Sequence, residues 1–204
     1  MKSGLRNSVA LFALFSSPAF LGAGEPITDA IAAVAAAGSA KAGANAAQIQ
    51  RGAFMVQVGG CNDCHTPWKL GPNGPEPDLT RMLSGHPQDL VMPPVPQMSE
   101  LWNVAFGATF TAAAGPWGVS FTRNLTPDPD TGLGMWTEAE FIATLRSGRT
   151  QGRGRELLPP MPWPPLSTLP EEDLKALWAF LRNLPPVVNK VPDPLPPPTP
   201  PPAK

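Results

Sequence analysis

The chain has 204 residues, and its 15 basic and 16 acidic residues nearly balance. This length allows one domain, or one domain with long appendages. Charged residues make up only 15% of the chain, and prolines number 29, far above the roughly 5% usual in soluble proteins. Nothing in the charge balance suggests nucleic acid as a partner. The composition instead predicts a small packed region surrounded by irregular chain.

The first 24 residues have the pattern of a signal peptide. Lys2 and Arg6 precede an apolar run over 9–15, which resumes after Pro18 and leads into small residues at 22–24. The run is short and interrupted by Pro18, so it is a poor membrane span. An uncleaved anchor that holds the protein near a membrane is the alternative. Removal of residues 1–24 leaves 13 basic residues against 16 acidic ones.

An alanine-rich stretch and a helix follow. Residues 25–45 are interpreted as a flexible tether with partial helicity, because glycines interrupt the alanines and little there can be buried. Asn45 is a candidate cap for a helix over 46–58 that Gly59-Gly60 ends. Ile49, Ala53 and Val56 recur on one face of it. Gly52 lies on that face too, as a tolerated glycine or as a place where another helix crosses closely.

The central motif is Cys61-Asn62-Asp63-Cys64-His65, which holds the two cysteines of the chain and one of its two histidines. Cys-x-x-Cys-His is the attachment motif of c-type haem. Each thiol adds to one haem vinyl group, and the histidine then offers a ring nitrogen to the iron. A Cys61–Cys64 disulfide and a thioredoxin-like redox pair are alternatives. Half of a zinc site is a third, but only His86 remains as a further strong ligand.

Residues 66–134 are rich in proline and glycine and predict a long irregular loop with short helical turns that covers a haem edge. An axial histidine needs an acceptor for its second ring nitrogen, often a backbone carbonyl. The Pro72 carbonyl is the first choice for this acceptor, followed by those of Pro67 and Pro75.

The same loop carries other side chains that could reach an iron atom. His86 stands between Gly85 and Pro87, which favours a surface turn over a second axial histidine. Three methionines are possible thioether ligands, although packing roles are more typical: Met82, Met92 and Met98. The stretch over 119–125 alternates in polarity and predicts a short extended piece.

A capping box at Thr137 and Glu140 starts a second helix that Gly148 ends, with Phe141, Ile142 and Leu145 directed inward. Four arginines lie close together at the end of this helix and just after it: Arg146, Arg149, Arg153 and Arg155. They form a solvated basic loop, or one or two of them pair with haem carboxylates while the others face a redox partner.

Met161 lies between Pro160 and Pro162 on a rigid non-helical loop. A weakly binding thioether needs such support to remain on iron, whereas the alternative role for Met161 is packing against Trp163. Thr168 and Glu171 form a second possible capping box, and a helix is predicted from there to about residue 183. Residues 187–204 predict a proline-rich extended spacer or docking strand.

The order of these pieces resembles class I c-type cytochromes, and especially the periplasmic cytochrome modules of bacterial membrane dehydrogenases. The similar segments are the attachment motif, 124–128, 131–136 and Pro160-Met161-Pro162. The resemblance covers about 46–186 and implies an all-α class I cytochrome c fold with a long loop insertion and disordered termini. The expected units are a signal peptide (1–24), a tether (25–45), a cytochrome domain (46–186) and a tail (187–204).

The resemblance implies that Cys61 and Cys64 hold one haem c covalently, with His65 as proximal ligand and Met161 as distal ligand. His/Met ligation raises the reduction potential and leaves no open iron position. The chain is therefore expected to be a periplasmic electron carrier with no catalytic residue and no enzyme activity of its own. Its expected partners are a dehydrogenase or a terminal oxidase. A haem enzyme or gas sensor from which Met161 dissociates, and a haem-free disulfide module, are the alternatives.

Overall fold

The computed structural model describes residues 25–42, 45–99 and 101–197. The predicted signal peptide and the last seven residues of the tail therefore lie outside the described residues. The helices are α1 (Glu25–Ala42), α2 (Ala46–Val58), α3 (Cys61–His65), α4 (Glu138–Ser147), α5 (Trp163–Leu166) and α6 (Glu171–Leu181). Short 3-10 turns occur at Leu79–Arg81 and Thr150–Gly152.

The strands form two small antiparallel sheets. β1 (Trp68–Gly71) pairs with β2 (Gly74–Pro77), and β4 (Ala112–Gly115) lies between β3 (Ala105–Phe106) and β5 (Gly118–Phe121). The prediction of an all-α fold is therefore wrong. These strands are two to four residues long, too short to show an alternating pattern, and three of the four residues of β4 are alanines, which favour helix. The region predicted as an irregular loop holds both sheets.

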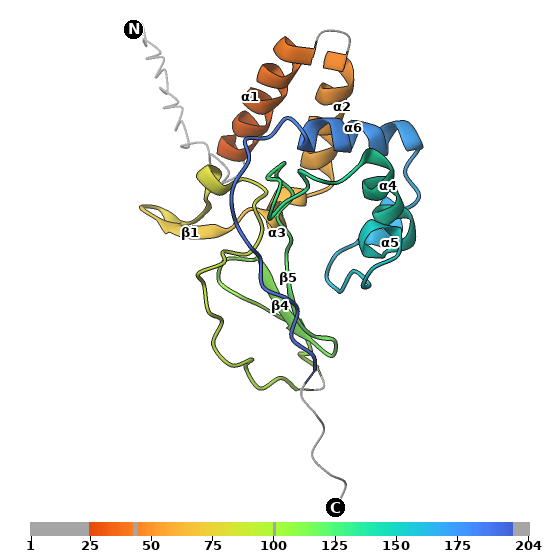
Figure 1. Cartoon of the computed structure of the whole chain (residues 1–204). Helices are drawn as coiled ribbons and strands as arrows, with labels where there is room; N and C mark the ends of the chain where they lie inside the picture. Colours follow the sequence, from red (N-terminus) through yellow and green to blue (C-terminus); the bar gives the residue numbers. More distant parts are fainter. Residues whose placement is uncertain (1–24, 43–44, 100, 198–204) are drawn as a thin grey trace, which may run out of the picture.

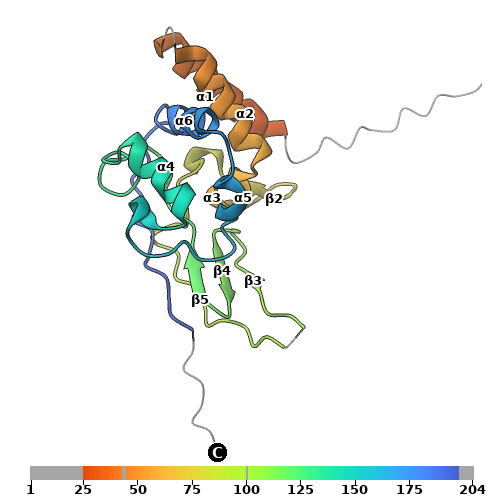
Figure 2. The ribbon, with the colours of Figure 1, turned by 90° about the vertical axis from the view of Figure 1, so that its right-hand side faces the viewer.

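The helices α1, α2 and α6 gather at one end of the molecule, and the β3–β5 sheet extends from the other end, with α3 between them (Figures 1 and 2). The α2–α6 crossing is the centre of the core, where Ile49, Val56 and Phe180 are almost fully buried. Gly52 makes the crossing close: a Cβ atom there would overlap the carbonyl oxygen of Ala176 and lie 2.7 Å from Phe180 Cβ. The second interpretation of Gly52 is thus confirmed.

An ion pair joins the same two helices. Arg51 on α2 donates to both carboxylate oxygens of Asp173 in the first turn of α6, at 2.7 and 3.0 Å. Bidentate arginine–carboxylate pairs fix orientation as well as distance. The pair therefore sets the rotation of α2 against α6.

The first and last described segments, α1 and residues 187–195, are packed against the domain and not disordered as expected. Helix α1 covers most of the predicted tether, and its Ile31 and Ala35 are buried in the main core. Buried alanines need a close neighbour rather than a large side chain, and α2 supplies it. At the other end, residues 187–195 lie against the loops and β5, and Leu195 pairs with Val119 through two 2.9 Å backbone hydrogen bonds.

Several predicted boundaries agree with the structure. Helix α2 spans the predicted residues, although the Asn45 side chain makes no capping bond. The capping box of Thr137 and Glu140 is confirmed, and α4 ends at Gly148. The second capping box is wrong: Pro170 occupies the N-cap of α6, and Thr168 donates instead to the Pro165 carbonyl at 2.8 Å. Within the described ranges, no helix has both the length and the apolar character needed to cross a membrane.

Candidate functional site

The attachment motif forms a helix of its own. Gly60 adopts a left-handed conformation (φ 62°) after α2, and the chain then turns once through α3 from Cys61 to His65. Residues three apart on a helix lie on the same side, so the turn directs Cys61 and Cys64 to one side. Both are free, partly exposed thiols.

The surroundings of these thiols favour an uncharged sulfur. Burial raises the pKa of Cys61 to about 11, and burial followed by the charge of Asp63 raises the pKa of Cys64. A thioredoxin-like pair requires the opposite shift, because its chemistry depends on a stabilised thiolate. A thioether carries no charge and suits this environment.

His65 is buried, and its ring is fixed by one hydrogen bond. Nδ1 lies 2.8 Å from the backbone carbonyl oxygen of Arg123. A carbonyl only accepts, so Nδ1 carries the proton and Nε2 presents its lone pair. Among the described residues, no group is hydrogen-bonded to Nε2. Burial lowers the pKa of His65, opposed by the Arg123 carbonyl, so the neutral form is favoured.

The acceptor of this bond is not one of the predicted prolines. The hairpin β1–β2 pairs Pro75 with Leu70, while the Pro67 carbonyl accepts from the Asp78 amide at 2.8 Å. The acceptor belongs to Arg123, which lies 58 positions further along the chain than His65. Local sequence patterns do not reveal such a contact.

Gly85 allows the Arg123 segment to approach His65. The Gly85 amide donates to the His65 carbonyl at 2.8 Å. Gly85 has φ +79°, and a Cβ atom there would lie 2.6 Å from the carbonyl carbon of Arg123. A side chain would thus push the acceptor away, so Gly85 belongs to the support of His65.

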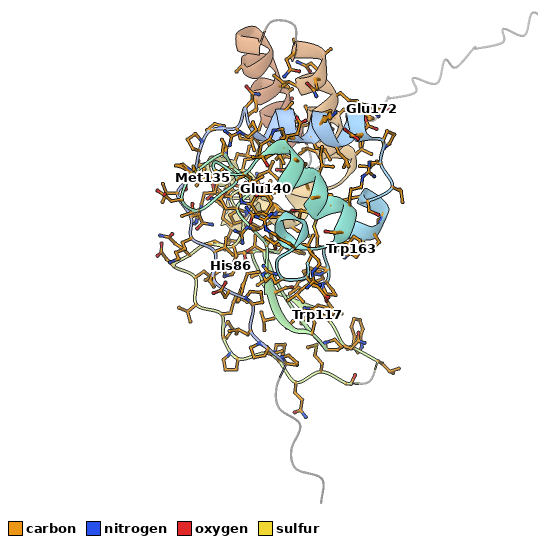
Figure 3. All side chains as sticks on the ribbon, turned by 45° about the vertical axis from the view of Figure 1, so that its right-hand side comes forward. His86, Trp117, Met135, Glu140, Trp163 and Glu172 are labelled. Atoms are coloured by element: carbon orange, nitrogen blue, oxygen red, sulfur yellow. The ribbon has the colours of Figure 1, made fainter. Side chains whose placement is uncertain are left out.

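His86 is not the surface residue that was expected. It is fully buried, its Nδ1 lies 2.9 Å from Thr111 Oγ1, and its Nε2 lies 3.2 Å from the Leu90 carbonyl (Figure 3). Its ring also packs against Phe121, with centroids 4.7 Å apart. Both ring nitrogens have protein partners, so His86 is a structural residue and is not free to bind iron.

Met161 is partly buried and packs against the main core, as does Cys61. Ser120 Oγ donates to the Pro159 carbonyl at 2.6 Å, which ties the loop before Met161 to β5. Trp163 lies at the end of α4 (Figure 3), where a Cβ atom on Gly148 would come within 2.6 Å of Trp163 Cζ2. The loop that carries Met161 is thus fixed on both sides.

The other loop methionines have different surroundings. Met82 is buried in the core, and Met92 lies beside Gly107, where an added Cβ would be 2.7 Å from Met92 Cε. Met98 is partly exposed. Met82 and Met92 therefore have the packing contacts that the sequence suggested.

Most of the predicted arginine cluster has local partners. Arg149 pairs with Glu156 at 2.8 Å, Arg153 with Glu140 at 3.4 Å, and Arg146 donates to the Ser167 carbonyl. Arg155 donates to the Glu156 carbonyl at 3.1 Å. Arg146 and Arg155 thus bond to backbone carbonyls, whereas Arg149 and Arg153 pair with carboxylates.

Arg123 is a candidate that the sequence analysis missed. Burial lowers its pKa and the nearby charge of Arg155 lowers it further, while the charge of Asp193 partly opposes them. Its guanidinium lies 5.8 Å from the ring centroid of Trp136, and no carboxylate forms a salt bridge with it in the described part of the chain. A carboxylate beside them would offset the repulsion between the two guanidinium groups, which makes Arg123 and Arg155 a candidate carboxylate site.

Buried polar atoms without partners also lie in these segments. In the described residues, Asn62 Nδ2 within the motif and Thr122 Oγ1 beside Arg123 have no hydrogen-bond partner. Such atoms are rare in proteins and often mark a site that takes another polar group. Within the same residues, no group of three or more His, Cys, Asp or Glu side chains is placed to hold a metal ion. The two thiols, the His65 Nε2 without a hydrogen-bond partner and the candidate carboxylate site at Arg123 and Arg155 together fit a covalently attached haem.

Comparison with known proteins agrees with this assignment. No protein-family model matches the chain. It is 31% identical over 153 residues to the cytochrome c subunit of a quinone-dependent alcohol dehydrogenase from Gluconacetobacter polyoxogenes, which covers 74% of this chain. It is 28% identical over 145 residues, 71% of this chain, to the gluconate 2-dehydrogenase cytochrome c subunit of Pantoea cypripedii. The chain is a homologue of the cytochrome c subunits of bacterial dehydrogenases.

The chain spans about a quarter of the length of these relatives, 25% in both cases. A shorter match, 36% identical over 69 residues, is to a diheme c-type cytochrome of Cereibacter sphaeroides and covers 34% of this chain and 23% of that protein. Homology to cytochromes c implies haem c as the cofactor.

Proposed function

We propose that this chain is a periplasmic c-type cytochrome that holds one haem and passes single electrons between partner proteins. The observation that carries the proposal is the contrast between its two histidines. His65 follows the two thiols and keeps Nε2 free while Nδ1 is fixed, whereas both ring nitrogens of His86 are engaged. The relatives named above are cytochrome c subunits of dehydrogenases, which supports the same function.

Each residue has a distinct part in holding the group. Cys61 and Cys64 form the thioethers, His65 Nε2 binds the iron, and the Arg123 carbonyl keeps that nitrogen unprotonated. Met161 would supply a second iron ligand from its fixed loop, and the guanidinium groups of Arg123 and Arg155 would donate hydrogen bonds to the haem carboxylates. When bound, the haem supplies a one-electron iron couple, and with both axial positions filled it offers no site for a substrate.

The proposed partners follow from the same comparison. A dehydrogenase subunit supplies the electrons, and another cytochrome or a terminal oxidase removes them. The protein itself transforms no substrate. The signal-like residues 1–24 support a periplasmic location, where covalent attachment of haem takes place.

The test is spectroscopic and uses the two histidines as a matched pair. We expect the full chain, expressed with export and haem attachment, to show the α band of a c-type haem after reduction. His65→Ala should abolish the low-spin spectrum, whereas His86→Gln should retain it. A chain without an α band, or equal loss in both variants, would contradict the proposal.

Met161 is tested separately. Met161→Ala should remove the weak charge-transfer band of methionine-ligated ferric haem, and Met98→Ala should keep it. Persistence of the band in Met161→Ala would show that another methionine is the ligand.

A further inference from the structure

We infer that the C-terminal strap, residues 187–195, positions the axial histidine through the two loops that contact His65. This inference rests on the proposed function, because it assigns the strap to the haem site. The strap leaves the end of α6, crosses the loops and runs beside β5 (Figure 1).

The first loop that the strap holds carries the acceptor of the His65 ring. Asn124, directly after Arg123, is fully buried, and its Nδ2 donates to the Val187 carbonyl at 2.8 Å. Thr126 Oγ1 accepts from the Val187 amide at 3.1 Å. The strap thus binds the chain immediately beyond the Arg123 carbonyl.

The second loop contains Gly85, which donates to the His65 carbonyl. Asn189 is fully buried, and its Nδ2 donates to the carbonyls on both sides of Gly85, those of Ser84 at 2.7 Å and His86 at 2.9 Å. Its Oδ1 accepts from Arg81 at 3.0 Å and from the Gln88 amide at 2.9 Å. One side chain therefore spans the whole turn around Gly85.

The two loops are also bonded to each other. The His86 amide donates to the Thr122 carbonyl at 2.9 Å, and the Leu125 amide donates to the Leu83 carbonyl at 2.9 Å. Arg123 lies between Thr122 and Leu125, so its carbonyl moves only if this paired unit moves. The strap closes that unit from the outside, because Asn189 holds one loop and Val187 holds the other.

Far from the site, the strap is held by a different contact. Leu195 pairs with Val119, and Gly118 (φ +98°) lies so close that a Cβ atom there would be 2.6 Å from the Pro196 carbonyl carbon. This end has no hydrogen bond to the His65 loops. A variant there loosens the strap without touching the Asn189 contacts, and it therefore serves as a control.

The deciding variant is Asn189→Asp, measured in the full-length holoprotein. It keeps an acceptor for Arg81 and Gln88 but removes the donor to the Ser84 and His86 carbonyls. We expect hydrogen exchange of the His65 ring N–H and the Gly85 amide to accelerate by about tenfold or more. The matched controls are Val188→Ala, whose side chain is 73% exposed, and Leu195→Pro; neither should change these two rates by more than about twofold.

Three outcomes decide the inference. Acceleration in Asn189→Asp alone supports it. Unchanged exchange at both positions in Asn189→Asp, with a lowered melting temperature, overturns it and makes the strap a general stabiliser. Equal acceleration in Leu195→Pro also overturns it. Should Asn189→Asp fail to fold, Asn124→Asp removes the Val187 contact and is judged by the same rates.

Failure of the proposed function gives a different result. A wild-type chain that lacks the c-type α band contradicts the haem assignment, and the two exchange rates, then measured in the haem-free chain, still report on the strap. Conversely, a normal α band with unchanged exchange rates in Asn189→Asp contradicts only the inference that the strap positions His65.

Discussion

His65 and His86 have the same side chain, are both buried, and differ in what their ring nitrogens contact. His65 has one fixed nitrogen and one without a protein partner, whereas His86 bonds to Thr111 and to the Leu90 carbonyl. The Gly-His-Pro context of His86 indicated a surface turn, because sequence context gives no sign of the partners that bury a ring. The Cys-x-x-Cys-His pattern, by contrast, places His65, the proposed ligand, and both thiols within the short helix α3.

The buried His86 predicts a pH dependence of stability. Burial lowers its pKa, and the charge of Arg81 lowers it too, while the Leu90 carbonyl partly opposes them. Between the folded and the unfolded pKa, the unfolded chain binds more protons, so stability falls as the pH drops below the unfolded value of about 6.5. His86→Gln should flatten the dependence of the urea midpoint on pH between about 7 and 5. An unchanged slope in this variant would show that His86 does not contribute.

At the scale of the helix pair, Gly52 controls the α2–α6 crossing. Gly52→Ala should lower the free energy of unfolding by about 2 kcal/mol, because backbone overlap outweighs the better helix propensity of alanine. Gly38→Ala on α1 is the matched control, because the nearest atoms to an added Cβ there are side-chain atoms of Asn183 at 3.1 Å, whereas an added Cβ at Gly52 overlaps backbone. Urea unfolding of both variants measures the difference. An equal change in the free energy of unfolding in the two variants would contradict the close crossing.

The Arg51–Asp173 pair predicts acid sensitivity of the same crossing. The hydrogen bond and charge of Arg51 hold the pKa of Asp173 below its usual value. Because the pKa of Asp173 is lower in the folded protein, the ion pair contributes to the free energy of unfolding at pH values above the unfolded pKa of about 3.9. This contribution is lost as the pH falls through the folded pKa. Asp173→Asn should therefore have a lower free energy of unfolding than the wild type at pH 7, and the difference between the two proteins should become smaller below about pH 4. Glu172→Gln, at an exposed neighbouring position, is the control, and a constant gap would contradict the assignment.

The elements also show what the sequence could and could not predict. Amphipathic spacing identified α2, α4 and α6, since each buries one face. The sheets were missed because strands as short as Ala105–Phe106 have no period to detect. Helix α1 was missed as a packed element because its buried face is mostly alanine, which shows helix propensity but little hydrophobic contrast.

At the scale of the whole molecule, the missed information is long-range. The His65 acceptor is contributed by Arg123, and Asn189 reaches back 105 positions to the Ser84 carbonyl. Both contacts use backbone carbonyls, which every residue carries, so no residue type marks them. The proline-rich composition of the tail suggested an extended spacer. Residues 187–195 contain no helix and contact the loops and β5, and no sequence pattern indicated that Asn189 would be buried there.

The single attachment motif makes a prediction about the haem content of this chain. The two cysteines of the chain are both in that motif, so under the proposed function this chain is expected to hold one haem. The alkaline pyridine spectrum should give about one haem per polypeptide, and a redox titration should follow a single Nernst curve with one electron. Because methionine stabilises ferrous iron, Met161→His should lower the midpoint potential, while the haem count stays the same. Two resolved redox steps in the wild type would contradict a single haem, and an unchanged potential in Met161→His would contradict methionine as the ligand.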